Sequence, residues 1–565
     1  MKASDYIADY LVNKEITDVF GYPGGMVTHL MDSLSKYPIN SHVTYHEQGA
    51  AFAACGYAQE SGKVGVAYAT SGPGATNLIT GICDAYFDSI PTLFITGQVN
   101  TFESKGELGV RQRGFQETDI VAIVTPVTKF AAKIEDASKL RWYLDYAFYI
   151  ASEGRKGPVL LDIPMNIMRS DIDPDTLQGF TAPIYDRGAS FDALLRLISQ
   201  SSRPVILAGS GVKASGASKL LNEVAHKLNI PVVTTMLAVD APEDSYGFIG
   251  AYGSRTANFI VAKSDLVISL GARLDVRQTG ADRGNFAPDA RIVRVDIDKG
   301  ELEYKVHPDE IDIHADVKDV LEVLLEAKVQ ELSGWNAVCR RIRSELEHID
   351  DSLPNRLIKR ISEIIPPDSV ITTDVGQNQV WIAQSFKVKS GQRIFFSGGH
   401  GAMGYSLPAS IGCAVSLKDT VYSFSGDGGI QMNIQELQTI AREKLPVKII
   451  LLNNSALGMI RHFQEMYFEN NYVQTVPDGG YTVPDFGEIS RAYKIPYTLV
   501  QSIEDIRDDL FSPDGPQFIE VRIDEPTYVF PKLEFGKPNQ DQEPLLDREL
   551  YDKLMKFDET DIEDM

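Results

Sequence analysis

Residues 421–459 read VYSFSGDGGIQMNIQELQTIAREKLPVKIILLNNSALGM, and their pattern is the most informative in the chain about its fold. Two apolar runs, Val421–Ser425 and Lys448–Leu452, have the character of buried strands, with a helix starting between them. A strand, a helix and a second strand in this order predict a βαβ unit with parallel strands. Asp427 and Asn454 then follow the carboxyl ends of neighbouring strands, where open parallel sheets bind ligands.

The residue types at this predicted edge favour a metal–phosphate site. The oxygens of Asp427 and Asn454 suit magnesium, which prefers oxygen ligands and phosphate partners. Gly426 and Gly428 allow backbone amides to approach a diphosphate at the start of a helix. The competing interpretation is a Gly/Asp turn followed by an asparagine pair in an ordinary loop.

The rest of the chain repeats this design. Strands are predicted at Val64–Thr70 and Thr92–Thr96 around a helix at Thr76–Phe87, and the middle of the chain alternates in the same way. The predicted fold class is α/β with three doubly wound parallel-sheet domains. The predicted segments are domains at 1–172, 187–335 and 365–535, a linker near 170–188, and a tail at 536–565 that is weakly ordered or wraps a neighbour.

Composition excludes several function classes. The 565 residues carry a formal net charge of −24, which repels nucleic acid and anionic membranes. No apolar run approaches the roughly 18 residues that span a bilayer, and the N-terminal stretch lacks the apolar core of a signal peptide. The four cysteines have no metal-like spacing and are expected to be buried free thiols. A cytoplasmic protein is predicted.

A second motif is His46-Glu47-Gln48-Gly49-Ala50-Ala51. Glu47 precedes a long stretch of small residues that reads as a helix. A carboxylate facing such packing must find a partner or take up a proton. A solvent-facing glutamate at a helix start is the simpler alternative, because that position favours an acid.

Taken together, these motifs resemble those of thiamine-diphosphate enzymes, and the chain up to about residue 535 resembles the catalytic subunit of acetolactate synthase. The GDG and NN pair looks like the family's diphosphate–magnesium motif. Further similar segments are Gly21–Gly25, Ser71–Gly74 with Asn77, Arg113–Glu117, Asp374–Asn378 and Ser397–Gly404. The resemblance implies three α/β domains, with the cofactor bridging the first domain of one subunit and the third domain of another.

The resemblance also implies roles for individual residues. Magnesium would be bound by Asp427, Asn454 and the carbonyl of Ala456, and Glu47 would hydrogen-bond the aminopyrimidine ring and promote the ylid. Met403 would be the wedge that bends the cofactor, although a methionine there could also simply fill the core. The implied cofactor contacts are Pro23, Gly24, Gly74, Asn77, Gln377, Asn378, Gly401, Met403, Gly426, Gly428, Gly429 and Met459. The implied catalytic residues are Glu47, Phe115, Gln116, Arg277 and Phe463.

The middle domain resembles the FAD-bearing branch of the family. The implied FAD contacts are Arg155, Gly209, Gly211, Thr235, Gly250, Gly271, Arg273, Asp275, Asp296 and Asp316. The alternative is that these glycines only close turns in a domain without cofactor.

The substrate channel combines one match with several departures. Arg277 matches the arginine that binds the carboxylate of a second 2-ketoacid, a role that suits a guanidinium; a surface salt bridge is the alternative. Phe463 stands where the family has tryptophan, and Asn378 where histidine is common. Ala251 and Tyr252 replace the Met-His of an MHG segment, and Met165 replaces a lysine. A wider, less cationic channel could admit a larger acceptor.

We therefore predict a carboligase with thiamine diphosphate, Mg²⁺ and FAD as cofactors. It would decarboxylate pyruvate and add the two-carbon unit to a second carbonyl, most simply pyruvate, giving 2-acetolactate. The alternatives are an activated keto-sugar acceptor, a 2-ketoacid decarboxylase and a catalytically silent regulatory paralogue. The expected assembly is a homodimer or homotetramer, with a small regulatory subunit as a further partner and no nucleic acid or membrane partner.

Overall fold

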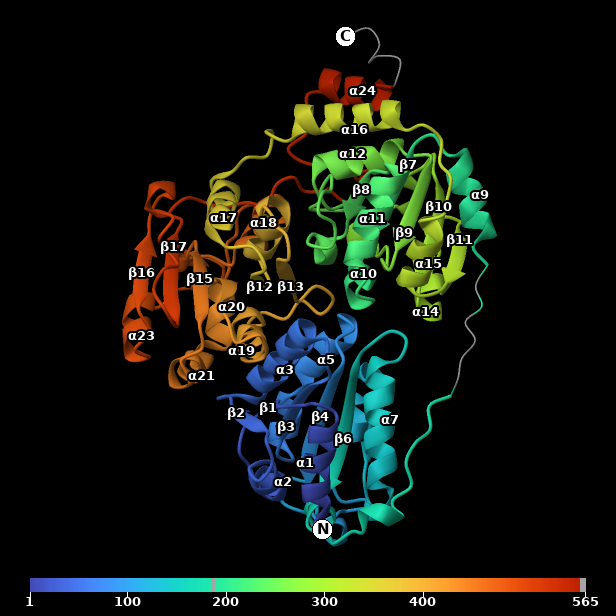
Figure 1. Cartoon of the computed structure of the whole chain (residues 1–565). Helices are drawn as coiled ribbons and strands as arrows, with labels where there is room; N and C mark the ends of the chain where they lie inside the picture. The colour runs from blue at the N-terminus through green and yellow to red at the C-terminus, as the bar shows by residue number, and fades with distance from the viewer. Residues whose placement is uncertain (184–187, 189, 559–565) are drawn as a thin grey trace. The chain divides into compact units, whose positions relative to one another are not determined.

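The computed structural model describes residues 1–183, 188 and 190–558, and it divides into two compact units (Figure 1). Unit 1 comprises residues 1–184, 369–378 and 395–526, and unit 2 comprises residues 185–368, 379–394 and 527–565. Unit 1 carries two six-stranded sheets, and unit 2 carries a five-stranded sheet. The prediction of three parallel-sheet α/β domains is confirmed. Part of the predicted linker, residues 184–187 and 189, lies outside the described residues.

The first sheet of unit 1 has the strand order β2-β1-β3-β4-β6-β5, with every pair parallel. Side chains along β3 point alternately to the two faces of the sheet, and both faces are covered. Val66 and Tyr68 belong to the buried cluster on one face, and Ala67 and Ala69 to the cluster on the other. The strands are β1 Asp18–Gly21, β2 Asn40–Val43, β3 Gly65–Ala69, β4 Thr92–Gln98, β5 Phe130–Lys133 and β6 Pro158–Pro164. The main helices are α1 Ala3–Asn13, α2 Thr28–Leu34, α3 Glu47–Ser61, α4 Pro73–Asn77, α5 Ile79–Phe87, α6 Ile120–Val124, α7 Leu140–Ser152 and α8 Met165–Met168.

The second sheet of unit 1 has the order β13-β12-β14-β15-β17-β16. β14 and β15 pair in parallel, with Gly426 opposite Leu452, as the sequence predicts. The strands are β12 Val370–Thr373, β13 Arg393–Phe396, β14 Val421–Gly426, β15 Val447–Asn453, β16 Tyr497–Val500 and β17 Gln517–Arg522. The helices of unit 1 in this part of the chain are α19 Ser406–Leu417, α20 Asp427–Met432, η8 Ile434–Glu436, α21 Leu437–Glu443, α22 Gly458–Tyr467 and α23 Phe486–Ala492, whereas α17 Leu353–Ile364 and most of α18 Gln377–Ser385 belong to unit 2.

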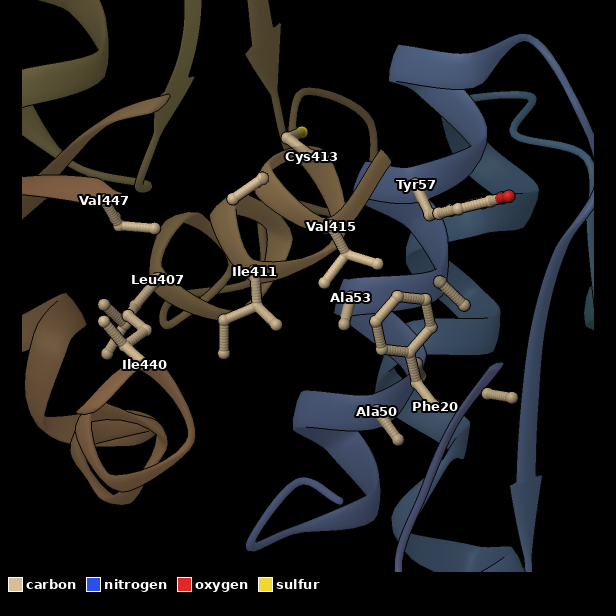
Figure 2. Close-up of a cluster of buried hydrophobic side chains, with 14 of the residues drawn as sticks. Phe20, Ala50, Ala53, Tyr57, Leu407, Ile411, Cys413, Val415, Ile440 and Val447 are labelled. Atoms are coloured by element: carbon tan, nitrogen blue, oxygen red, sulfur yellow. The ribbon is translucent and has the colours of Figure 1, made fainter. Parts of the chain in front are cut away.

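Helices α3 and α19 join the two sheets of unit 1 through one buried cluster (Figure 2). Ala50 and Ala53 of α3 and Ile411 of α19 belong to this cluster, and Figure 2 shows Leu407 of α19 on the other side, next to Ile440. The contact is close because both helices are rich in small residues, so their backbones approach each other directly. The long small-residue stretch after Glu47 is thus a helix packed against another helix.

Unit 2 is built on the sheet β11-β10-β9-β7-β8, whose described pairs are all parallel. Its strands are β7 Pro204–Ala208, β8 Val232–Thr234, β9 Leu266–Leu270, β10 Arg291–Asp296 and β11 Ile311–His314. Its helices are α9 Asp192–Gln200, α10 Ser210–Ala214, α11 Ser218–Leu228, α12 Arg255–Lys263, α13 Val276–Thr279, α14 Lys299–Glu303, α15 Val317–Leu324, α16 Ser333–Leu346 and α24 Arg548–Lys556. Separate buried clusters lie on its two faces.

The acidic tail differs from the expectation of weak order or of wrapping a neighbour. Up to residue 558 it folds onto unit 2 itself, and α24 lies beside α12 and α16 (Figure 1). Leu546, Leu554 and Phe557 enter the buried cluster there. Buried Arg255 anchors the tail by donating to the carbonyls of Gln542 and Pro544 at 3.0 and 2.7 Å. Residues 559–565 of the predicted tail lie outside the described residues.

The predicted helix at residues 76–87 is divided at Leu78 into α4 and α5, which leaves Asn77 at the end of α4. All four cysteines are free, and Cys55, Cys339 and Cys413 are buried. Across residues 1–183, 188 and 190–558, no helix combines the length and apolarity that crossing a bilayer requires.

Candidate functional site

Glu47 is the first residue of α3 and lies almost completely buried. The side-chain amide of Asn77 donates to its Oε2 at 2.8 Å. Its Oε1 lies beside Gly74, where an added Cβ would come within 3.1 Å of that oxygen. The glutamate is therefore held in place and is not a solvent-facing residue at a helix start. The resemblance implied that Glu47, Gly74 and Asn77 belong to one cofactor site, and in the structure the three residues lie together.

The glycine turns around Glu47 converge because β1 and β3 are neighbouring strands. The turn after β1 contains Pro23 and Gly24, and a Cβ on Gly24 would lie 2.3 Å from the Cβ of Thr70 at the end of β3. Gln116 packs against Gly72, with its backbone at a φ of 62° that non-glycine residues rarely adopt. Phe115 beside it is 79% exposed.

The predicted metal edge forms at the ends of β14 and β15. The amide of Ala456 donates to Asp427 Oδ2 at 3.1 Å and lies 3.2 Å from Asn454 Oδ1. Gln377 Oε1 accepts from the side-chain amide of Asn454 at 3.0 Å. Burial raises the pKa of Asp427 to about 7, against the lowering effect of its hydrogen bonds. A buried carboxylate and a neighbouring amide oxygen form a donor set that suits a hard cation.

The loops above this edge leave space next to backbone, as a diphosphate requires. Asn378 is 3% exposed, and its Oδ1 has no hydrogen-bond partner. Its amide nitrogen lies 3.3 Å from the Cβ positions that Gly376 and Gly426 lack. The unpartnered Oδ1 is an acceptor, so a contact from Asn378 to phosphate oxygens depends on this amide nitrogen, a donor that the family's common histidine also offers at this position.

Met403 belongs to the same cluster. A Cβ on Gly428 would lie 3.2 Å from Met403 Cε, so the glycine lets the methionine reach the metal edge. Gly401 has a φ of 70° and lies in the exposed turn just before it. Gly429 packs against the carboxylate of Asp374, and Met459 lies half-buried in α22, after the metal loop.

In unit 2, the predicted FAD contacts gather at the carboxyl edge of one parallel sheet. Gly209 follows β7, Thr235 follows β8, Gly271 follows β9, Asp296 ends β10 and Asp316 follows β11. Dinucleotides bind at such an edge. Close packing between Gly209, Gly211 and Gly271 already requires small residues, because a Cβ on Gly209 would lie 2.1 Å from the Gly271 carbonyl oxygen.

The acidic members of this set have local partners. Asp275 Oδ2 accepts from the Arg273 guanidinium at 2.9 Å, and Asp316 caps the start of α15. Arg155 lies in unit 1, where its Nε donates to Ser89 at 2.9 Å. The edge fits an extended polar ligand at the ends of all five strands.

Arg277 is exposed on α13, and its guanidinium lies 5.9 Å from the ring centre of Tyr252. Gly250 allows this arrangement, because a Cβ there would lie 2.3 Å from the carbonyl oxygen of Arg277. Ala251 donates its amide to that carbonyl at 2.8 Å. The departures at 251 and 252 therefore contact the arginine, and the surface ion pair considered for Arg277 is replaced by an aromatic contact.

Among the other channel residues, Phe463 is 48% exposed on α22 and packs against Tyr467, with ring centres 4.6 Å apart. Met165 is half-buried at the start of α8.

Comparison with known proteins identifies the family of this chain. The family models described as thiamine pyrophosphate enzyme, N-terminal TPP binding domain, central domain and C-terminal TPP binding domain match residues 1–123, 191–324 and 374–521. The chain is 36% identical over 561 residues to the acetolactate synthase isozyme 2 large subunit of Escherichia coli strain K12, covering 96% of this chain and 99% of that protein.

The chain belongs to the acetolactate synthase large-subunit family of thiamine pyrophosphate enzymes. It is also 36% identical to the acetolactate synthase large subunit of Lactococcus lactis, over 92% of each chain. Identity to the chloroplastic acetolactate synthase 1 of Zea mays is 35%, over 95% of this chain and 87% of the maize protein.

Thiamine diphosphate is the cofactor of this family, and magnesium and FAD are typical of acetolactate synthases. The described residues fit all three groups: a buried carboxylate and amide edge for the cation, the Asn378 amide nitrogen beside Gly376 and Gly426 for the diphosphate, and a sheet edge for FAD.

Two further residues lie at the metal edge: Tyr481, which the sequence did not indicate, and Asp374, which was predicted only as part of the segment Asp374–Asn378 and without a role of its own. The Tyr481 hydroxyl donates to Asp427 Oδ1 at 3.3 Å, and buried Asp374 accepts the Gly404 amide at 2.9 Å. Asp374 directly follows β12, and its place at the end of a strand of the same sheet would have indicated that it lies at this edge. Tyr481 had no comparable signal, because a long loop brings it back to the edge.

Proposed function

We propose that the chain condenses two molecules of pyruvate into 2-acetolactate and carbon dioxide. One carbon–carbon bond to a carboxylate breaks, a new one forms at the ketone carbon of the second pyruvate, and one proton is taken up. The observation that carries this proposal is the buried pair Glu47–Asn77, in the unit that also holds the oxygen-donor edge at Asp427 and Asn454.

When bound, thiamine diphosphate supplies the electron sink that makes decarboxylation of a 2-ketoacid possible. Asp427 and Asn454 would hold the cation that anchors the diphosphate, and Asn378 would donate to phosphate oxygens. Glu47 would exchange a proton at its carboxylate with the pyrimidine ring, while Asn77 fixes the orientation of that carboxylate.

Arg277 would bind the carboxylate of the second pyruvate. Its exposed guanidinium keeps its donors available, and contact with Tyr252 limits its orientations. The relatives named acetolactate synthase support pyruvate as both substrates.

We also propose that the enzyme acts in the cytoplasm as a homodimer or homotetramer, with a small regulatory subunit as a partner. Relatives named large subunits support the small partner. The exposed rings of Phe463, Tyr467 and Phe468, which pack against one another, support association of like chains, because a contiguous exposed apolar group often marks a contact surface. Sedimentation analysis with and without cofactors tests the assembly.

A pyruvate assay tests the reaction. Protein with thiamine diphosphate, magnesium and FAD should release carbon dioxide and 2-acetolactate in equal amounts. Arg277→Gln should lose acetolactate formation while releasing carbon dioxide, with acetaldehyde accumulating. Carbon dioxide with acetaldehyde but no acetolactate from the unaltered enzyme would refute pyruvate as acceptor and point to a larger carbonyl substrate, as the departures at 251, 252 and 463 allow.

A further inference from the structure

Glu436 is a fully buried acid that the reaction described above does not use. It ends η8, in the crossover between β14 and β15, and its side chain is 0% exposed. A carboxylate removed from water requires hydrogen-bond partners. Burial raises its pKa to about 7, while hydrogen bonds from Thr439 and from the amides of Tyr45 and His46 act in the opposite direction.

Glu436 has one local partner, Thr439 of α21, and two backbone partners in the first domain of the same chain, the amides of Tyr45 and His46. The Tyr45 amide donates to its Oε1 at 2.9 Å, and Thr439 Oγ1 lies 2.9 Å from its Oε2. Tyr45 and His46 directly precede Glu47. Glu436 therefore fixes the backbone from which the proposed catalytic glutamate extends.

Gly49 provides the space for this contact. A Cβ on Gly49 would lie 2.6 Å from Glu436 Oε1, so the carboxylate lies directly against the first turn of α3. An anion is stabilised at the start of a helix, where amides are unpaired.

Asn433 provides a second link in the same crossover. Its side-chain amide donates to Gln48 Oε1 at 3.0 Å and to the Gly404 carbonyl at 2.9 Å. Gln48 neighbours Glu47, and Gly404 follows Met403. Residues 433–436 thus connect the start of α3 with the turn that carries the methionine.

We propose that Glu436 is a positioning residue for Glu47, acting through the backbone of Tyr45 and His46. The inference rests on the proposed role of Glu47. It predicts that losing the acceptor at position 436 loosens this backbone and impairs proton transfer by Glu47, even when the cofactor is saturating.

Three variants test the role of the hydrogen bond. Glu436→Ala removes the acceptor, and Glu436→Gln retains an oxygen that can accept the Tyr45 amide. Glu443→Gln is the matched control: Glu443 lies on the adjacent α21 and contacts His42 of the first domain at 2.6 Å, but it does not contact residues 45–48 in the described hydrogen bonds. Gly49→Ala displaces the Glu436 carboxylate without removing it. This variant replaces Glu436→Ala in the test if Glu436→Ala does not fold.

The first measurement is hydrogen–deuterium exchange by mass spectrometry of peptides covering residues 43–52 in the cofactor-free protein. Glu436→Ala and Gly49→Ala should exchange about tenfold faster at Tyr45 and His46, since each loses a buried hydrogen bond. Glu436→Gln and Glu443→Gln should stay within about threefold of the unaltered protein.

The second measurement is exchange of the thiazolium C2 proton of saturating thiamine diphosphate, followed by NMR without substrate. The same two variants should slow it by about tenfold, and Glu436→Gln and Glu443→Gln should not. Unchanged exchange in Glu436→Ala by either method would overturn the inference. Equal loss in Glu443→Gln would also overturn it, because a general loosening between the two domains would then suffice.

These measurements separate the inference from the proposed function. An unaltered enzyme with rapid C2 exchange but no acetolactate would refute only the proposed reaction. Unchanged C2 exchange in Glu47→Gln would refute the role of Glu47, and with it the basis for Glu436.

Discussion

The replacement Gly412→Ala should disrupt the contact between α3 and α19. A Cβ at this position would lie 1.8 Å from the carbonyl oxygen of Ala53 and 2.7 Å from the amide nitrogen of Tyr57. Both are backbone atoms, so no rotation of a side chain can relieve the overlap. Ordinary contact begins at 3.4 Å, so the helices must separate by about 1.5 Å at this point.

The cost should reach about 3 kcal/mol, the upper part of the range for overpacked cores, because two backbones must move apart. The separation also affects function: α3 begins at Glu47, and α19 begins two residues after Gly404. We expect a lower melting temperature of the cofactor-free protein and a loss of acetolactate formation.

Differential scanning calorimetry of Gly412→Ala beside Gly109→Ala provides the assay. Gly109 has no atom within 4 Å of its Cβ position, so its replacement controls for the added methyl group alone. The two variants should differ by about 3 kcal/mol in free energy of unfolding. A difference below about 1 kcal/mol would refute the reasoning, because the close backbone approach would then carry no steric constraint.

Three other predictions concern the site and the boundary between the domains. Glu47→Gln should abolish C2-proton exchange of thiamine diphosphate while the cofactor still binds, as isothermal titration calorimetry can show. Asp427→Ala should lose the thermal stabilisation that magnesium and thiamine diphosphate give together, because the buried oxygen donor is removed. His42 lies between Asp18 and Glu443 with its pKa raised to about 9, its hydrogen bonds to both carboxylates outweighing desolvation. Its charged form therefore contributes fully below pH 6.5, and this contribution disappears as pH rises through about 9. Urea unfolding of the unaltered protein and of His42→Gln should show their difference shrinking by about 2 kcal/mol between pH 6 and pH 9.5.

Each of these predictions has a result that contradicts it. If Glu47→Gln exchanged the C2 proton at nearly the rate of the unaltered enzyme, Glu47 would not take part in proton transfer. If magnesium and thiamine diphosphate stabilised Asp427→Ala as much as the unaltered protein, the cation would not be bound by Asp427. A difference between His42→Gln and the unaltered protein that does not change with pH would mean that the imidazole contributes by packing on Phe20, against which it stacks, rather than by charge.

The sequence was most informative where chemistry and local geometry coincide. Strand β14 and the asparagines after β15 predicted a shared edge, because parallel neighbours end on the same side of a sheet, and the structure places Asp427 and Ala456 within a hydrogen bond there. The strands predicted at Val421–Ser425 and Lys448–Leu452 occur as β14 and β15, since short apolar runs between turn residues are typical of buried strands.

Long-range contacts were not accessible in this way. Glu436 meets Tyr45, and His42 meets Glu443, across nearly four hundred residues, and no periodicity in either segment indicates the partner. Helix α24 is different: Leu550, Leu554 and Phe557 follow helical spacing and could have been predicted as a packed face. The acidic composition of the segment instead favoured the prediction of a weakly ordered tail.

The tail on unit 2 has a consequence for the order of events during synthesis. Residues 527–558 leave the ribosome after both sheets of unit 1, yet they supply the carbonyl partners of Arg255 and part of a buried apolar cluster. Until the tail is made, unit 2 of a nascent chain is therefore incomplete: Arg255 has its partner Asp350 but lacks the carbonyl acceptors of Gln542 and Pro544. We therefore expect chaperones to bind, and proteases to cleave, truncated translation products mainly within residues 185–368, although the residues that are missing lie at 527–558.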